Sequence, residues 1–199
     1  ILDLGKAQRL AQDFTAAGAT LTGLDKKVLD ESLKTIWEAR SKVEQARVHL
    51  DAGKAQNART VVGNAANLLA EITTDKAEVA TLQRTVDMLK GRCETVDKNY
   101  TAAVNYFEGL ISKAGRKVDL KVVGLLGKGE ALFRQGAAGG NSKTLRKAQM
   151  AFAQAAVLDP GQGDFSAMAS YYLGEVTLAL GAKAGGSTRA KDYFKEVVR

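Results

Sequence analysis

The sequence predicts an all-α protein, and three observations support this class. Apolar residues recur at three- and four-residue spacing along most of the 199 residues, which is the period of an amphipathic helix. The two-residue alternation that is typical of a half-buried strand is nearly absent. Twenty glycines stand beside a single proline, and aromatic residues make up only 6% of the chain, which favours closely packed helices over a β-sandwich.

Helix-breaking residues divide the chain into about nine predicted helices. Glycine, proline or small polar residues cluster at 18–23, 53, 73–75, 115, 136–141, 160–163 and 181–186. The first helix is predicted over residues 1–23, with Leu4, Ala7, Leu10, Ala11 and Phe14 on one face. Residues 118–126 could pass for a strand, but helical spacing continues through 128–133, so a helix is predicted there. Side-chain oxygens that could cap helix N-termini are those of Asp25, Asp75, Asp119, Ser142, Asp164 and Ser187.

A small residue, a second small residue and then a larger apolar one recur four times along the chain. The copies are Ala46 with Ala58 and Val62, Gly91 with Ala103 and Phe107, Gly127 with Ala148 and Phe152, and Gly174 with Ala190 and Phe194. Small residues let two helix backbones approach, and the larger side chain one turn later fills the space beside them. The pattern therefore predicts a series of antiparallel helix pairs.

At these residues the sequence resembles the tetratricopeptide repeat family, whose pattern has Leu-Gly in the first helix, Ala-x3-Phe in the second and a closing proline. The resemblance is strongest at Leu126-Gly127, which is followed by Pro160, and at Leu173-Gly174. It implies an α-solenoid over residues 24–199, with units at about 35–73, 75–114, 119–160 and 164–199. Residues 1–23 would then be an N-terminal capping helix.

The sequence departs from the family pattern in several places. The tryptophan that precedes Leu-Gly in the family is missing from all four units, and Val62 replaces the phenylalanine of the first unit. The third and fourth units carry glycine-rich extra residues at 136–141 and 181–186. Extra residues in a stacked repeat are accommodated in loops, so both segments are predicted to be lengthened turns. Whether these turns cover the groove of the solenoid is left open.

The sequence lacks the residue patterns of an enzyme. One cysteine, Cys93, excludes an intrachain disulfide and multi-cysteine metal sites, and one histidine, His49, excludes His-rich centres. His49 is expected to pack between helices, and Cys93 to be a small buried hydrophobic residue. The stretch 136–144 resembles a phosphate-binding loop only superficially, because Ser142 stands where a glycine is needed before Lys143. No catalytic residue, cofactor or metal is therefore predicted.

The resemblance also implies where a partner would bind. In this family the first helix of each pair lines a concave groove, and the positions that would face the groove include Arg40, Arg47, Arg92, Lys121 and Lys128. Tyr171 would line the more apolar end. Five of the six positions taken from the first three units are cationic, and the chain has a net charge of +7. These charges predict a partner protein or peptide of acidic character. The Lys/Asn carboxylate clamp of the chaperone-binding members is not reproduced.

We therefore expect a non-catalytic scaffold that binds an acidic segment or docks one subunit of a larger assembly. The alternative is a solute-binding or transport accessory protein, periplasmic, that holds a small anionic ligand. A third hypothesis rests on net charge alone and predicts non-specific binding to nucleic acid or to an anionic membrane surface. No specific nucleic-acid binding is predicted, a membrane-associated assembly is left open, and the oligomeric state is not predicted.

The compartment is only weakly indicated. The chain begins at Ile1 rather than Met, so we expect that an upstream stretch has been removed. Together with one cysteine and many Ala- and Gly-rich helices, this favours a bacterial, exported or periplasmic location over a cytoplasmic one.

Overall fold

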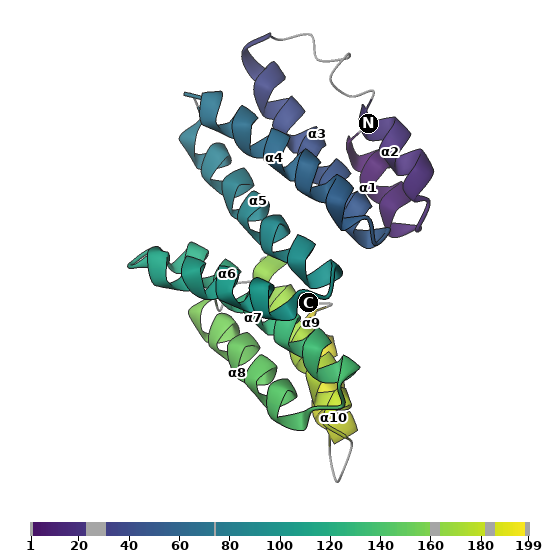
Figure 1. Cartoon of the computed structure of the whole chain (residues 1–199), viewed down its shortest axis with the longest axis vertical. Helices are drawn as coiled ribbons and strands as arrows, with labels where there is room; N and C mark the ends of the chain where they lie inside the picture. Colours follow the sequence, from purple (N-terminus) through teal and green to yellow (C-terminus); the bar gives the residue numbers. More distant parts are fainter. Residues whose placement is uncertain (1, 23–30, 74, 160–163, 182–185, 198–199) are drawn as a thin grey trace. The chain divides into compact units, whose positions relative to one another are not determined.

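The structure, a computed structural model, describes residues 2–22, 31–73, 75–159, 164–181 and 186–197. Within these ranges the chain forms ten α-helices and no strand (Figure 1), which confirms the all-α prediction. The chain divides into two compact units, Ile1–Asp97 and Lys98–Arg199, and each is described by itself.

The described residues of the first unit form five helices. They are α1 (Leu2–Leu10), α2 (Phe14–Thr22), α3 (Glu31–Asp51), α4 (Ala55–Glu71) and α5 (Lys76–Val96). Helix α4 packs on α3, and α5 packs on both. Their shared core is made of small and branched side chains together with Cys93, and it includes Val43, Val62, Val86 and Leu89.

The N-terminal region differs from its prediction. A single helix was expected over 1–23, whereas the structure has two helices joined by a turn at Gln12, which has a φ of +62°. The Asp13 carboxylate accepts a hydrogen bond from the Ala16 backbone N–H at 3.0 Å and so caps α2. Leu10, which was expected on the apolar face, is 74% exposed. Ala17 and Leu21 form a core cluster with Val48 of α3, and Leu2 and the predicted Phe14 pack against this cluster.

Five helices are likewise described in the second unit. They are α6 (Tyr100–Ala114), α7 (Val118–Ala138), α8 (Ser142–Leu158), α9 (Asp164–Ala179) and α10 (Gly186–Val197). Helix α7 packs against α6 and α8, α9 packs against α8 and α7, and α10 packs on α9. The helix predicted at 118–126 is thus confirmed as the start of α7. The predicted repeat unit 75–114 joins α5 and α6, whereas the structure assigns them to different compact units.

Glycine and phenylalanine residues pack together at three helix contacts in the second unit. A Cβ atom added to Gly127 would lie 2.1 Å from the Phe107 ring, and one added to Gly174 would lie 2.5 Å from the Phe194 ring. A Cβ atom added to Gly129 would lie 2.5 Å from the Phe152 ring. The predicted contact of Gly174 with Phe194 is therefore confirmed. The predicted contact of Gly127 with Phe152 is wrong, because Gly127 packs on Phe107 and it is Gly129 that packs on Phe152.

The turn between α7 and α8 is shorter than predicted. Residues 136–138 belong to α7, where Gly136 is buried against Leu145, and the helix ends at Gly139. Gly140 has a φ of +59°, and the Asn141 side chain accepts a hydrogen bond from the Thr144 N–H at 3.0 Å. Asn141 thus caps α8 in place of the predicted Ser142. The other glycine-rich segment, 181–186, lies mostly outside the described residues.

Of the other predicted N-cap residues, one is confirmed, one is wrong and three have side chains outside the described part of the chain. Asp75 caps α5 as predicted, because its side chain accepts a hydrogen bond from the Glu78 N–H. Asp119 lies in the first turn of α7, whose N-cap is Lys117. Asp25 and the side chains of Asp164 and Ser187 lie outside the described part of the chain.

Candidate functional site

Two of the predicted groove residues in the first unit have carboxylate partners within the chain. The Arg40 guanidinium lies 4.6 Å from the centre of the Trp37 ring and forms an ion pair with Glu78 of α5. Arg47 forms an ion pair with Glu44 at 2.9 Å. Glu44 itself is buried and also lies 3.9 Å from Arg9 of α1. These two cations are therefore already neutralised by acidic groups of the chain.

The predicted groove residues divide equally between the compact units. Arg92 lies on α5 and is half-buried, so it joins Arg40 and Arg47 in the first unit. Lys121, Lys128 and Tyr171 lie in the second unit. The structure therefore describes two groups of three, one in each unit.

The three groove residues of the second unit have different surroundings. Lys128 of α7 forms an ion pair with Glu108 of α6 at 2.8 Å. Tyr171 of α9 is 44% exposed and makes edge and tilted ring contacts with Tyr172 and Phe194. Lys121 lies at the edge of an open cleft between α7 and α8, and no carboxylate partner for it is present among the described residues.

This cleft has a volume of about 480 Å³ and is mainly apolar. Lys121 and Leu125 line it from α7, and Met150, Val157 and Leu158 line it from α8. Met150 is 65% exposed and Val157 is 79% exposed, whereas the opposite side of α8 buries Leu145 and Phe152 in the core. The two exposed side chains lie seven residues apart, so they share one face of the helix.

Cations extend this surface toward the start of α8. A second depression is lined by Lys143, Arg146, Lys147 and again Met150. Helix α8 has no acidic residue, and within the described ranges no ion pair joins these three cations to a carboxylate. We define the α8 face as the surface formed by Lys121, Lys143, Arg146, Lys147, Met150 and Val157. Of this set, only Lys121 was predicted from the sequence.

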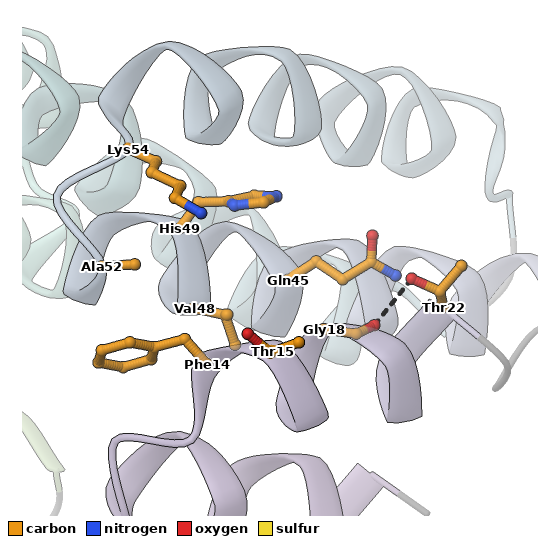
Figure 2. Close-up of a pocket in the computed structure, with 9 residues that line it drawn as sticks. All are labelled: Phe14, Thr15, Gly18, Thr22, Gln45, Val48, His49, Ala52 and Lys54. Carbon is orange, nitrogen blue, oxygen red and sulfur yellow. Dashed lines mark hydrogen bonds between the residues drawn. The ribbon is translucent and has the colours of Figure 1, made fainter.

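A separate cavity of about 150 Å³ lies between α2 and α3 in the first unit. Figure 2 shows Lys54 and His49 side by side at one end, and Gln45 and Thr22 at the other. Phe14, Val48 and Ala52 supply its apolar lining. No aspartate or glutamate lines the cavity. Burial, together with the nearby Lys54 charge, holds the pKa of His49 below its ordinary value of 6.5.

The single thiol of the chain is buried. Cys93 is fully buried in the core of the first unit, as predicted. Burial raises its pKa to about 11, although the nearby Arg59 charge opposes this effect. The thiolate that would react is therefore scarce at neutral pH.

The described residues offer neither a metal centre nor a membrane-spanning helix. Among the described residues, no cluster of three or more His, Cys, Asp and Glu side chains is placed to hold a metal ion. No helix in these ranges combines the length and the apolar character needed to cross a membrane. Comparison of the chain with protein-family models, with curated proteins and with solved structures finds no match.

Proposed function

We propose that this protein is a non-catalytic interaction module, built from tetratricopeptide-like helix pairs, that docks an acidic and partly apolar segment of a partner protein. The packing within each unit supports the resemblance. Helix α5 contacts both members of the α3–α4 pair, and α9 contacts both members of the α7–α8 pair. This is the packing expected when the first helix of one pair lies on the pair before it.

The α8 face carries the proposal. It combines two exposed apolar side chains, Met150 and Val157, with cations that have no acidic partner among the described residues. A surface of this kind matches an amphipathic segment whose apolar residues cover Met150 and Val157 and whose carboxylates reach Arg146 and Lys147. The apolar contacts would supply binding free energy, and the charges would orient the segment.

The proposed site is shifted from the groove predicted by the sequence. Three of the predicted groove cations are already paired, Arg40 with Glu78, Arg47 with Glu44 and Lys128 with Glu108. A partner carboxylate that binds one of them would have to displace the glutamate from its ion pair. Such an exchange replaces one carboxylate by another, so it adds little net free energy. Lys121 needs no such exchange, because it has no carboxylate partner in the described ranges. It therefore remains in the proposed site.

The proposal is tested with a fluorescein-labelled synthetic peptide and the full chain. The peptide carries leucines on one helical face and glutamates beside them, and binding is measured by fluorescence anisotropy. The double variant Arg146→Glu/Lys147→Glu should weaken binding at least about tenfold, the loss expected when two charge-assisted contacts become repulsive. Lys113→Glu/Lys117→Glu, which changes the net charge equally in the same unit, is the matched control.

A second pair of variants tests the apolar part of the α8 face. Met150→Ser/Val157→Ser should also weaken binding about tenfold, because two apolar contacts are lost. Leu178→Ser removes an exposed apolar side chain of α9 and should leave binding unchanged. Equal losses in both charge variants would indicate non-specific attraction to a basic protein. No loss in any variant would contradict the proposal.

A further inference from the structure

We propose that the cavity between α2 and α3 binds a small monocarboxylate anion with a short apolar chain. The cavity lies in the first unit and does not involve the α8 face, so this inference is independent of the proposed docking function. It follows from three features of the cavity, namely its cationic end, its apolar side and its size.

The turn between α3 and α4 builds the cationic end. Gly53 has a φ of +73°, a left-handed conformation that glycine adopts without steric cost, and the Lys54 N–H donates a hydrogen bond to the His49 carbonyl oxygen at 2.7 Å. This hydrogen bond brings Lys54 back beside His49 (Figure 2). In the described part of the chain, neither side chain has an ion-pair partner, and the cavity lining contributes no opposing carboxylate.

The other polar side chains of the cavity differ in whether they already form hydrogen bonds within the protein. The Thr22 hydroxyl donates to the Gly18 carbonyl oxygen at 2.8 Å, and Gln45 Nε2 donates to Ser41 Oγ at 3.1 Å. The Thr15 hydroxyl lines the cavity without a hydrogen bond to another described residue. Gln45 Nε2 keeps a second N–H, so Thr15, Gln45, His49 and Lys54 are the groups able to donate hydrogen bonds to a bound anion.

The charge and size of the cavity select the class of anion. Lys54 supplies one full positive charge, while burial and Lys54 itself both disfavour protonation of His49. One fixed charge suits a monoanion better than a phosphate dianion. Phe14 and Val48 would cover a short hydrocarbon chain. A volume of about 150 Å³ gives room for a molecule of a few heavy atoms, such as a short carboxylate.

His49 provides a specific probe for the test, because it is the single histidine of the chain. Butyrate is titrated into the full protein at neutral pH and constant ionic strength, and the imidazole Hε1 resonance is followed by proton NMR. We expect a saturable shift with a dissociation constant of about a millimolar, as befits a ligand with few heavy atoms. Butyramide, which has the same shape without the charge, should bind at least about tenfold more weakly.

Variants locate the binding. Lys54→Met keeps the length of the exposed side chain and should weaken butyrate binding about tenfold, and Thr15→Val should weaken it several-fold. Lys113→Met, in the other unit, should leave the titration unchanged. A shift that never saturates, that butyramide reproduces, or that survives both cavity variants would overturn the proposal and identify the cavity as a solvent-filled crevice. Because the readout lies in the first unit, its failure leaves the peptide assay on α8 unaffected.

Discussion

At the scale of single residues, His49 links the folding stability to pH. Burial, followed by the charge of Lys54, holds its pKa in the folded protein below the ordinary value of 6.5. Between the folded pKa and 6.5 the unfolded chain binds more protons than the folded one, so acid favours unfolding. The stabilising contribution of neutral His49 is therefore fully present above pH 6.5 and is lost as the pH falls through the folded pKa.

We predict that the free energy of unfolding decreases as the pH is lowered through 6.5 and that His49→Gln removes part of this decrease. Urea unfolding followed by circular dichroism, at several pH values, measures both proteins. Other titrating groups contribute equally to the two, so the difference between the curves isolates His49. Identical pH dependence in the two proteins would show that the environment of His49 does not disfavour its protonation.

Cys93 provides a second prediction at this scale. The side chain is fully buried and its pKa is raised to about 11, so a soluble aromatic disulfide reagent should label it very slowly in the native protein. Labelling should accelerate with urea, because the thiol becomes accessible only when the first unit opens. Labelling is followed by the absorbance of the released thiolate. Immediate labelling in buffer alone would be inconsistent with a buried Cys93.

At the scale of helices, the surroundings of two glycines, Gly127 of α7 and Gly109 of α6, predict opposite effects for the same substitution. Gly127→Ala places a Cβ about where the Phe107 ring lies, and overpacking of this kind typically costs about 1–3 kcal/mol. Gly109→Ala lies inside α6 with no neighbouring atom within 4 Å of the new Cβ, and should stabilise by about 0.5–1 kcal/mol through helix propensity. Urea unfolding of the two variants gives both values. A destabilised Gly109→Ala or an unaffected Gly127→Ala would contradict the described packing.

The elements that sequence reasoning found are those with a local cause. The helical spacing of apolar residues predicted α7, and the Asp75 carboxylate predicted the start of α5. The turn between α1 and α2 was missed because no glycine or proline marks it; Gln12 adopts the left-handed conformation. Gly136 was assigned to a turn, but its contact with Leu145 keeps it helical, so tertiary packing overrides its low helix propensity.

The partners of α7 could not be predicted from spacing. Gly127 and Gly129 differ by about 200° around a helix, because each residue turns the chain by about 100°. They therefore lie on nearly opposite sides of α7, one toward Phe107 of α6 and the other toward Phe152 of α8. The repeat pattern assigns a single small residue to each first helix, which is why it matched Gly127 to Phe152.

At the scale of the whole molecule, the candidate sites were predicted only in part. The positive net charge indicated an acidic partner, and the resemblance selected Lys121. The carboxylate that pairs with Arg40 lies 38 residues away in sequence, and the one that pairs with Lys128 lies 20 residues away, so both contacts join different helices. Only the partner of Arg47, three residues away, lies on the same helix. The exposure of Met150 and Val157 depends on which side of α8 the core covers, so it becomes visible only in the folded chain.

The last prediction concerns the effect of salt on binding of the acidic peptide. A basic protein attracts any polyanion through long-range charge, and added salt screens this attraction. Contacts of Met150 and Val157 with an apolar ligand are not screened, so peptide affinity should fall with salt and then level off, whereas retention on heparin should be lost. The dependence of the dissociation constant on salt should be shallower for Arg146→Glu/Lys147→Glu than for Lys113→Glu/Lys117→Glu, although both carry the same net charge. Equal slopes would mean that the peptide senses only the total charge, which would contradict docking on the α8 face.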